Sequence, residues 1–398
     1  MKTTDPIHVA VVTETYPPEV NGVAMTLGRM VQGLLARGHR VSLTRPRQHA
    51  GDAPPVAPRL TTTLVRGLPI PGYAGLKFGL PAPRLLRRQW RADPPDVVQV
   101  VTEGPLGASA IAAARALGIP VVSEFHTNFH AYSRHYGFAW LEDMVAAHLR
   151  RLHNRSRMTL VPSRQLGLDL QRSGYCKLRV VARGVDTAQF NPARRSAELR
   201  AVWQVGDQDL VVAHVGRLAP EKNLPLVLST FAAIRRHAPG ARLLLVGDGP
   251  ARARLEREHP EHIYAGMRHG EDLAAHYASA DLFLFPSMTD TWGNVVLEAL
   301  ASGLPVVAYR MAAAAELIRH GANGMLADPG AGDQFERAAL DLVTRPGARR
   351  RTGKAAADSM ASLDWETIHE QLLAALREAI EQPAPPPAAA PVYGFLAD

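Results

Sequence analysis

Short apolar runs of strand length alternate with helix-like segments along most of this chain. The first unit is the apolar run at residues 7–13, followed by a segment that begins after Asn21 and carries apolar residues at helical spacing. Strands that are apolar on both faces and bounded by helices indicate a parallel sheet covered on both sides. The alternation therefore predicts an α/β fold built from doubly wound, Rossmann-like sheets.

The alternation starts afresh at residues 209–215, after a stretch around residues 184–192 that we interpret as a joint. A chain of 398 residues is also long for a single core, so two domains are expected. Ligands of such sheets bind at the carboxyl ends of the strands, which makes the cleft between the domains the expected binding site. We predict domains at residues 1–190 and 191–362, an amphipathic helix at 363–381 and a flexible Pro/Ala-rich tail at 382–398.

The composition limits the cellular setting and the kinds of site. A single cysteine, Cys176, excludes an intramolecular disulfide and a multi-cysteine zinc site, and it fits a reducing compartment. The N-terminus runs into a short strand, and no stretch approaches the roughly 20 apolar residues that span a bilayer. We therefore expect a cytoplasmic protein.

The chain is basic, with a formal net charge of +8. A helix around Trp90 that carries several arginines and no acid is typical of a surface that binds anionic membranes, but also of an ordinary solvated face. Both interpretations stay open. The sequence has no helix-turn-helix, zinc-finger or RNA-recognition pattern, so nucleic acid is not an expected partner. The candidate membrane residues are Arg84, Arg87, Arg88, Trp90 and Arg91.

Two carboxylates, Asp290 and Glu298, flank the start of a helix-like run that opens at Gly293 and Asn294. Seven residues separate them, so one lies in the loop before the helix and the other about one turn inside it. The N-terminus of a helix offers free N–H groups and a positive dipole end, which suits a phosphate. A phosphate site between two hydroxyl-accepting carboxylates describes a nucleotide-sugar pocket, whereas a helix cap and a surface acid are the simpler alternative.

Other candidates follow strands in both domains. Arg217 and Lys222 could neutralise a departing diphosphate, or they could belong to a charged exposed loop. Gly22 would let a diphosphate or sugar approach a helix N-terminus, although a tight turn capped by Asn21 is the favoured interpretation of this stretch taken alone. Gly247 opens a turn that resembles a dinucleotide fingerprint, but Arg252 stands where the third glycine would be, which weakens a dehydrogenase interpretation.

His126 comes just after an apolar strand and faces the expected cleft, where its ring could hydrogen-bond a sugar hydroxyl or a backbone group. His126 and His130 are four residues apart, but the glutamate of a zincin is missing and the local sequence is not helical. We expect no metal here.

These segments together resemble the family 4 retaining glycosyltransferases of the GT-B fold, over nearly all of residues 7–380. The resemblance is strongest to the subgroup of GDP-mannose-dependent α-mannosyltransferases and sulfolipid synthases. It implies an acceptor-side first domain, a nucleotide-sugar-binding second domain, and a C-terminal helix that crosses back onto the first. Its most specific stretches are residues 183–186, 216–223, 247–250 and 290–298.

The resemblance also implies roles for individual residues. Arg217 and Lys222 would bind the donor diphosphate, and Glu298 would accept ribose hydroxyls. Asp290 would contact the donor sugar, although the family more often has Glu there, one methylene longer. The implied catalytic residues are His126, Arg217, Lys222 and Asp290, and the implied donor-binding residues are Gly22, Gly247, Met267, Arg268, Gly293, Asn294, Val295 and Glu298.

The expected activity is therefore transfer of a hexose, with mannose from GDP-mannose as the first choice, to a hydroxyl of a lipid or glycan acceptor. Retention is implied by the family. No metal is expected, because cations and a helix end can meet the leaving charge and no Asp-x-Asp element of the kind that holds an ion for such chemistry is seen. A UDP-sugar-dependent glycolipid or sulfolipid synthase is the alternative enzyme. A protein that binds a nucleotide or nucleic acid without transferring a sugar is the alternative that is not an enzyme. The enzyme is expected in the cytoplasm, either free or peripheral at the inner face of the cytoplasmic membrane.

Overall fold

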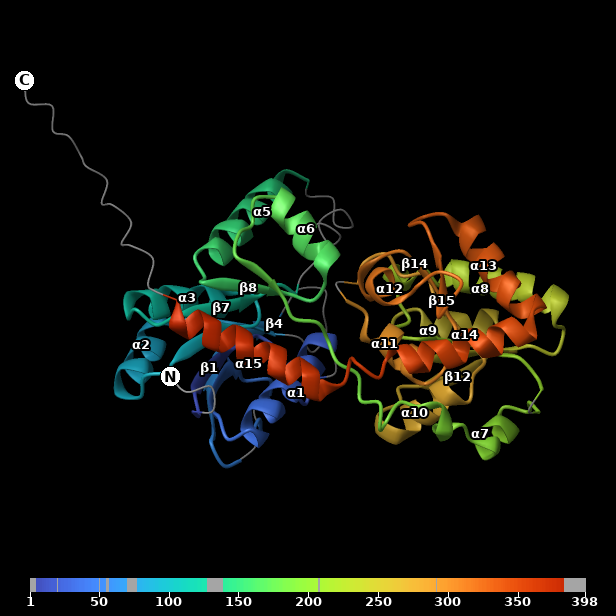
Figure 1. Cartoon of the computed structure of the whole chain (residues 1–398), viewed down its shortest axis with the longest axis horizontal. Helices are drawn as coiled ribbons and strands as arrows, with labels where there is room; N and C mark the ends of the chain where they lie inside the picture. The colour runs from blue at the N-terminus through green and yellow to red at the C-terminus, as the bar shows by residue number, and fades with distance from the viewer. Residues whose placement is uncertain are drawn as a thin grey trace, which may run out of the picture.

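The computed structural model describes residues 5–19, 21–49, 51–54, 57–69, 77–126, 139–206, 208–290 and 292–382. Figure 1 shows two lobes side by side along the long axis, each with its own sheet and its own helices. All strand pairs within the two large sheets are parallel, and helices connect most of their strands. The predicted α/β class with two doubly wound sheets is confirmed.

The first lobe contains a seven-stranded sheet with the order β3-β2-β1-β6-β7-β8-β9. Its interior strand β1 is buried along its whole length, as expected for an apolar strand with helices on both faces. The strands are β1 (His8–Val12), β2 (Arg40–Pro46), β3 (Leu60–Val65), β6 (Val97–Val100), β7 (Val121–Glu124), β8 (Met158–Val161) and β9 (Leu178–Val180). The helices are α1 (Gly22–Ala36), α2 (Pro83–Ala92), α3 (Pro105–Ala116), α5 (Ala139–Asn154) and α6 (Arg164–Arg172), and β4 (Gly67–Pro69) pairs with β5 (Lys77–Gly79) in a small antiparallel ribbon.

The second lobe contains a six-stranded sheet with the order β12-β11-β10-β13-β14-β15. The chain order reverses between β10 and β13, which is the switch point where such sheets bind ligands. The strands are β10 (Val211–Val215), β11 (Arg242–Val246), β12 (Ile263–Gly266), β13 (Leu282–Phe285), β14 (Val306–Tyr309) and β15 (Gly324–Ala327). The helices are α7 (Ala197–Val202), α8 (Leu224–His237), α9 (Arg252–Glu258), α10 (Gly270–Ala278), α11 (Asn294–Ala301), α12 (Ala312–Leu317), α13 (Gly332–Thr344) and α14 (Pro346–Ser359), with 3-10 turns at Pro192–Arg194 and Pro220–Lys222.

The last helix, α15 (Trp365–Glu381), packs against the first lobe. Ile368, Leu372 and Leu376 are fully buried in the same core as Val9 and Val11 of β1. Figure 1 shows this helix lying across the first lobe beside α1. The two termini of the described chain therefore both belong to the first lobe, while the residue limits predicted for the domains stay predictions.

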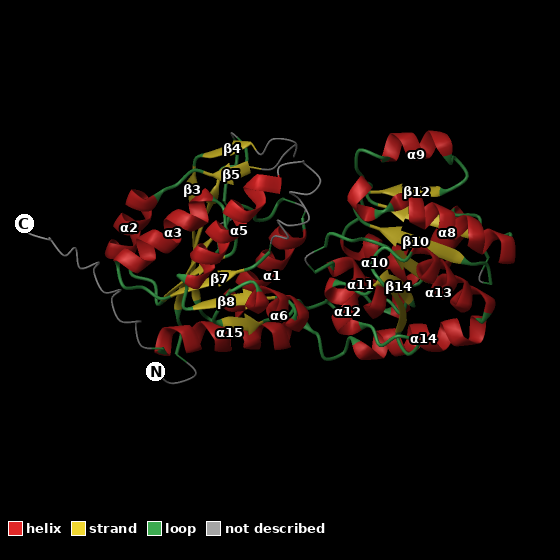
Figure 2. Cartoon of the chain, turned by 90° about the horizontal axis from the view of Figure 1, so that it is seen from above, coloured by secondary structure: helices red, strands yellow, loops and turns green. Residues whose placement is uncertain are grey.

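The lobes touch where helices that follow strand ends meet. Asn294, at the start of α11, donates from Nδ2 to Oγ1 of Thr26 in α1 at 3.4 Å. Glu316 of α12 accepts a hydrogen bond from the backbone N–H of Gln165 in α6 at 2.8 Å. Figure 2 shows α1 and α6 on the side of the first lobe that faces α11 and α12 of the second. Since α1 follows β1 and α11 follows β13, the carboxyl ends of the two sheets point toward this contact.

Helix α2 corrects one expectation. Trp90 is only 4% exposed, and it packs with Leu86 in the core under α2. The placement of Trp90 on a membrane-facing surface is therefore wrong. Residues four apart lie on the same side of a helix, so burying Leu86 and Trp90 together turns Arg84, Arg88 and Arg91 to the solvent. Within the described residues, no helix is long and apolar enough to cross a bilayer.

Candidate active site

Two helix N-termini face each other between the lobes. Asn21 caps α1, because its Oδ1 accepts from the backbone N–H of Ala24 at 2.9 Å. Gly22 follows, and a Cβ built there would lie 3.8 Å from Nδ2 of Asn294 in the other lobe. Among the described residues, no side chain caps α11, and Gly293 before it has a φ of 90°, which favours glycine. The backbone N–H groups at Asn294 and Val295 and the dipole of α11 therefore make this point suitable for an anion.

Lys222 and Asp290 form an ion pair next to this point. The ammonium Nζ lies 2.7 Å and 2.8 Å from the two carboxylate oxygens, and it lies 5.4 Å from the ring centroid of Phe285. Lys222 comes from the turn after β10 and Asp290 from the loop after β13, which are neighbouring strands at the switch point. The sequence predicted separate contacts of Lys222 with the diphosphate and of Asp290 with the sugar. The structure instead brings the two side chains together, 68 positions apart in the chain.

The turn that carries Arg217 rests on the turn at Gly247. A Cβ at Gly247 would lie 2.0 Å from the carbonyl oxygen of Gly216, and the φ of Gly247 is 132°. Only a glycine allows so close an approach of two backbones. The Arg217 guanidinium is half exposed and lies 3.8 Å from the carboxylate of Glu221. Gly247 thus shapes the loop that presents Arg217, and its own contact with a donor stays a prediction.

Glu298 lies on α11, and its carboxylate Oε2 accepts a hydrogen bond from the hydroxyl of Tyr277 on α10 at 2.9 Å. Burial raises the pKa of Glu298 to about 7, against the opposing effect of the Tyr277 hydrogen bond. Burial and the neighbouring carboxylate hold the pKa of Tyr277 well above its usual value, so this hydroxyl stays a donor. Glu298 as a whole is half-buried, and its contact with ribose stays a prediction.

His126 belongs to a buried network at the end of β7. Its Nε2 lies 2.8 Å from Oε2 of Glu124, and its Nδ1 lies 3.2 Å from Nη2 of Arg183. Burial acts to raise the pKa of Glu124, but the hydrogen bond and charge of His126, the charge of Arg183 and the Gln99 amide lower it to about 2. Both ring nitrogens of His126 are thus engaged inside the protein. Its contact with a donor sugar stays a prediction, and His130 lies outside the described residues.

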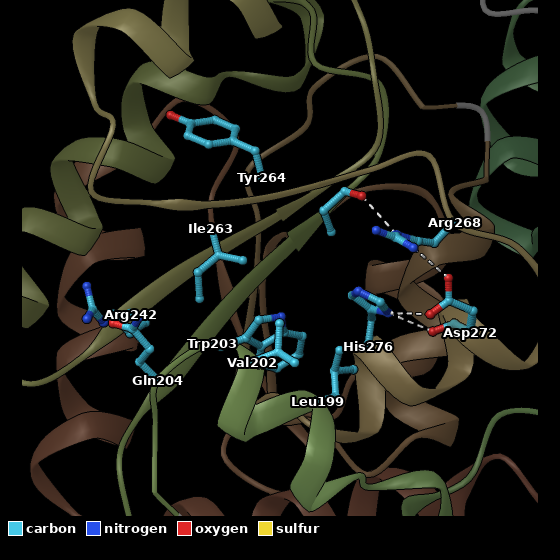
Figure 3. Close-up of a pocket in the computed structure, with 11 residues that line it drawn as sticks. Leu199, Val202, Trp203, Gln204, Arg242, Ile263, Tyr264, Arg268, Asp272 and His276 are labelled. Atoms are coloured by element: carbon cyan, nitrogen blue, oxygen red, sulfur yellow. Dashed lines mark hydrogen bonds and ion pairs between the residues drawn. The ribbon is translucent and has the colours of Figure 1, made fainter.

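Met267 and Arg268 follow β12, where the base was predicted. Met267 is 51% exposed, while Arg268 donates to the carbonyl oxygen of Ala265 at 2.8 Å and pairs with Asp272 at 3.0 Å. Figure 3 shows Arg268 at one end of a pocket of about 400 Å³. The described residues that line this pocket do not include the Lys222–Asp290 pair, so it is distinct from the point where the lobes meet. Besides Arg268, the pocket is lined by Leu199, Val202, Trp203, Gln204, Arg242, Ile263, Tyr264, Ala265, Asp272 and His276.

Known proteins resemble this chain over nearly its full length. Residues 20–189 match the model of "Glycosyltransferase Family 4" and residues 209–345 that of "Glycosyl transferases group 1". A GDP-mannose-dependent α-mannosyltransferase of Mycobacterium tuberculosis is 34% identical over 92% of this chain and 95% of its own length. The chain belongs to glycosyltransferase family 4. It is an enzyme, a hexosyltransferase, as the sequence predicted.

One further sequence relative and one solved structure also resemble this glycosyltransferase. The sulfoquinovosyl transferase SQD2 of Arabidopsis thaliana is 34% identical over 75% of this chain and 60% of its own. A sucrose-phosphate synthase of Thermosynechococcus elongatus has a TM-score of 0.77 at 19% identity, covering 94% of this chain and 98% of its own. At such a low identity the structural similarity speaks for the fold alone, and that similarity confirms the GT-B architecture.

Sequence reasoning missed the partners of the predicted residues in this glycosyltransferase. Tyr277, which holds Glu298, occupies a position in α10 that periodicity marks only as core. Arg183 lies in the stretch 183–186 that resembles the family. Its guanidinium lies 3.4 Å from the carboxylate of Glu124, which is 59 positions away in the chain. No local signal in the sequence announces either contact. Burial of a polar residue in a strand or core helix is the only hint, and it becomes visible only in three dimensions.

Proposed function

We propose that this glycosyltransferase moves mannose from GDP-mannose to a hydroxyl of a lipid or glycan acceptor, with retention of configuration and without a metal. The observation that carries the proposal is the meeting of Lys222, Asp290 and the uncapped start of α11 opposite Gly22, at the carboxyl ends of both sheets. The donor is suggested by the mannosyltransferase relative from Mycobacterium tuberculosis, whose name states its use of GDP-mannose.

The chemistry of the site supports this reaction. Breaking a sugar–diphosphate bond leaves negative charge on the phosphate and an oxocarbenium-like sugar, and an enzyme accelerates the step by binding that charge distribution. Lys222, Arg217 and the N–H groups at Asn294 and Val295 can neutralise the departing diphosphate. A departing phosphate oxygen is also placed to take the proton of the acceptor hydroxyl when both lie on one face of the sugar.

The remaining predicted residues have consistent places in this proposal. Glu298 would accept the ribose hydroxyls, with Tyr277 fixing the other carboxylate oxygen. Gly22 would leave room for the diphosphate, and Met267 and Arg268 would flank the base. His126 would act near the sugar from within its network with Glu124.

A UDP-sugar-dependent glycolipid or sulfolipid synthase is the second candidate, and the 34% identity to the sulfoquinovosyl transferase favours a donor sugar other than mannose. Both candidates need the same diphosphate site, so they differ at the base and the sugar. For the acceptor we propose a molecule at an anionic membrane surface on the cytoplasmic side, reached through the exposed arginines of α2.

A donor screen followed by product analysis tests the proposal. GDP should raise the melting temperature more than UDP or ADP, because a ligand that binds only the native state stabilises it. Labelled GDP-mannose should then transfer its sugar to membrane lipid extracts in the presence of a chelator, and nuclear magnetic resonance should show an α-linked product. A Glu298→Gln variant should lose transfer, whereas Glu258→Gln on α9 serves as the matched control. Transfer from a UDP-sugar alone would select the second candidate, and a β-linked product or a chelator-sensitive reaction would contradict retention or metal independence.

A further inference from the structure

Among the described residues, a histidine with no hydrogen-bond partner at one of its ring nitrogens lies under the proposed diphosphate site. His214 is on β10, two residues before the turn that carries Arg217, and it is fully buried. Its Nδ1 lies 3.0 Å from the carbonyl oxygen of Leu284 in β13. A carbonyl oxygen can only accept, so Nδ1 carries the proton and Nε2 presents a lone pair.

That lone pair is an acceptor kept ready for a donor. Burial, with the nearby charge of Lys222, lowers the pKa of His214 to about 4, so the ring is neutral at physiological pH. Within the described residues, Nε2 of His214 is buried and accepts no hydrogen bond. An unmatched acceptor of this kind is costly in a folded core, which suggests that a donor reaches it in another state of the enzyme.

The space in front of Nε2 borders Lys222. A Cβ built on Gly216 would lie 4.0 Å from Nε2 of His214 and also 4.0 Å from Cε of Lys222. Because residue 216 is a glycine with a φ of 150°, that volume contains no side chain of its own. Both the imidazole and the ammonium also lie near Phe285, with His214 at 6.3 Å between ring centroids and Lys222 Nζ at 5.4 Å.

The ion pair of Lys222 must change if the proposed function holds. Asp290 binds the ammonium through both oxygens, which leaves little of its charge and few of its N–H groups for a diphosphate. A diphosphate would repel the Asp290 carboxylate, and a sugar hydroxyl would need that carboxylate as an acceptor. The two proposed roles therefore require the ammonium and the carboxylate to separate.

We propose that His214 is a positioning residue for Lys222: when the diphosphate of the donor enters, the ammonium leaves Asp290 and donates to the diphosphate and to Nε2 of His214. This inference rests on the proposed function of Lys222. The exchange keeps the ammonium hydrogen-bonded throughout, and it releases Asp290 toward the hydroxyls of the sugar.

Two substitutions at residue 214 distinguish the role of Nδ1 from the role of Nε2. His214→Asn keeps an N–H near the position of Nδ1, and with it the bond to Leu284, but removes the acceptor. His214→Gln can place an amide oxygen near the position of Nε2. His237→Asn, at the exposed end of α8, is the matched surface control.

The readout is the affinity of each variant for GDP, UDP and ADP and for the matching monophosphates, measured by calorimetry. For the nucleotide that the wild type binds, we expect His214→Asn to weaken the diphosphate about tenfold, the typical effect of one hydrogen bond to a charged group, and to leave the monophosphate unchanged. His214→Gln should recover most of the loss. In a Lys222→Met background, His214→Asn should have no further effect on the diphosphate.

The outcomes separate this inference from the proposed function. If Lys222→Met weakens the diphosphate but His214→Asn does not, or weakens both nucleotides alike, His214 has only a structural role and the inference is wrong. If Lys222→Met leaves the diphosphate unchanged, or the wild type binds no nucleoside diphosphate, the diphosphate site itself fails and the inference with it. Should the variants not fold, the ¹⁵N shift of Nε2 in the wild type must move when GDP, or whichever diphosphate binds, is added, and an unchanged shift overturns the inference.

Discussion

At the scale of single residues, the site depends on acids and bases whose environment sets their protonation. Glu298 has a pKa of about 7, raised by burial, and Tyr277 restrains that rise by donating to it. A carboxylate accepts two ribose hydroxyls, whereas the protonated acid must spend one oxygen as a donor. Binding of the donor should therefore improve as pH rises through the pKa of Glu298.

Replacing Tyr277 by Phe removes the hydroxyl that donates a hydrogen bond to Glu298, and this should raise the pKa of Glu298. Without the hydrogen bond the pKa of Glu298 rises further above 7, so at pH 7 more of the acid is protonated and the KM for the donor increases. We expect the variant to approach the wild-type KM near pH 9 and to differ several-fold at pH 7. A profile of KM between pH 6 and 9 measures this. A variant that is equally impaired at every pH would show that Tyr277 acts only through packing.

His214 makes a second residue-scale prediction, on stability. Its pKa is about 4 in the folded protein against an ordinary 6.5, so between these values the unfolded chain binds more protons. The contribution of His214 to the free energy of unfolding should therefore be fully present above pH 6.5. It should fall by up to about 3 kcal/mol as the pH drops to 4, at 1.36 kcal/mol per pH unit. Urea unfolding of the wild type and of His214→Asn at pH 7.5 and 4.5 checks it. An equal loss in both proteins would assign the acid sensitivity to other groups.

At the scale of helices and strands, the sequence predicted the elements better than their faces. Apolar runs such as β10 and β13 identify themselves by composition, because a strand covered on both sides must be apolar throughout. Trp90 of α2 was placed on the wrong face, since an arginine-rich helix with one Trp fits a membrane surface and a packed core equally well. The pair of Lys222 and Asp290 was also beyond the sequence, which fixes the strand ends but not which side chains meet there.

Because Trp90 is buried, a membrane contact of α2 should depend on its exposed arginines and not on Trp90. The exposed arginines are available to anionic headgroups, while Trp90 is buried and remains so. We expect sedimentation with vesicles of anionic phospholipid that weakens with salt and is lost when Arg84, Arg88 and Arg91 are changed to Ser. Trp90 fluorescence should stay unchanged on binding. Arg254 and Arg257 of α9, changed to Ser, provide the control, and equal sedimentation of the α2 variant would mean that its arginines only face solvent.

At the scale of the whole molecule, few polar contacts between described residues hold the two lobes at their meeting point. Asn294 reaches Thr26, and Glu316 reaches the backbone of Gln165 at the N-terminus of α6. Arg29 of α1 also pairs with Asp186 in the connecting segment at 3.1 Å. In the proposed function most donor-binding residues come from the second lobe, whereas Gly22 and His126 come from the first, so the proposed site is complete only when the lobes are close. Opening and closing are then expected to accompany each turnover.

Glu316 offers a direct test of this closure. Its carboxylate meets an N–H group and the positive end of α6, but the contact is exposed, so its loss should cost only about 0.5–1 kcal/mol. That is enough to shift a closed population roughly two- to fivefold toward open forms. We expect Glu316→Ala to increase the radius of gyration in small-angle X-ray scattering. A nucleoside diphosphate should reverse the increase by bridging the lobes. Glu258→Ala on α9 should leave the scattering unchanged. If Glu316→Ala scatters like the wild type with and without nucleotide, the hydrogen bond to α6 does not hold the lobes together, and other contacts such as Asn294 with Thr26 and Arg29 with Asp186 must do so.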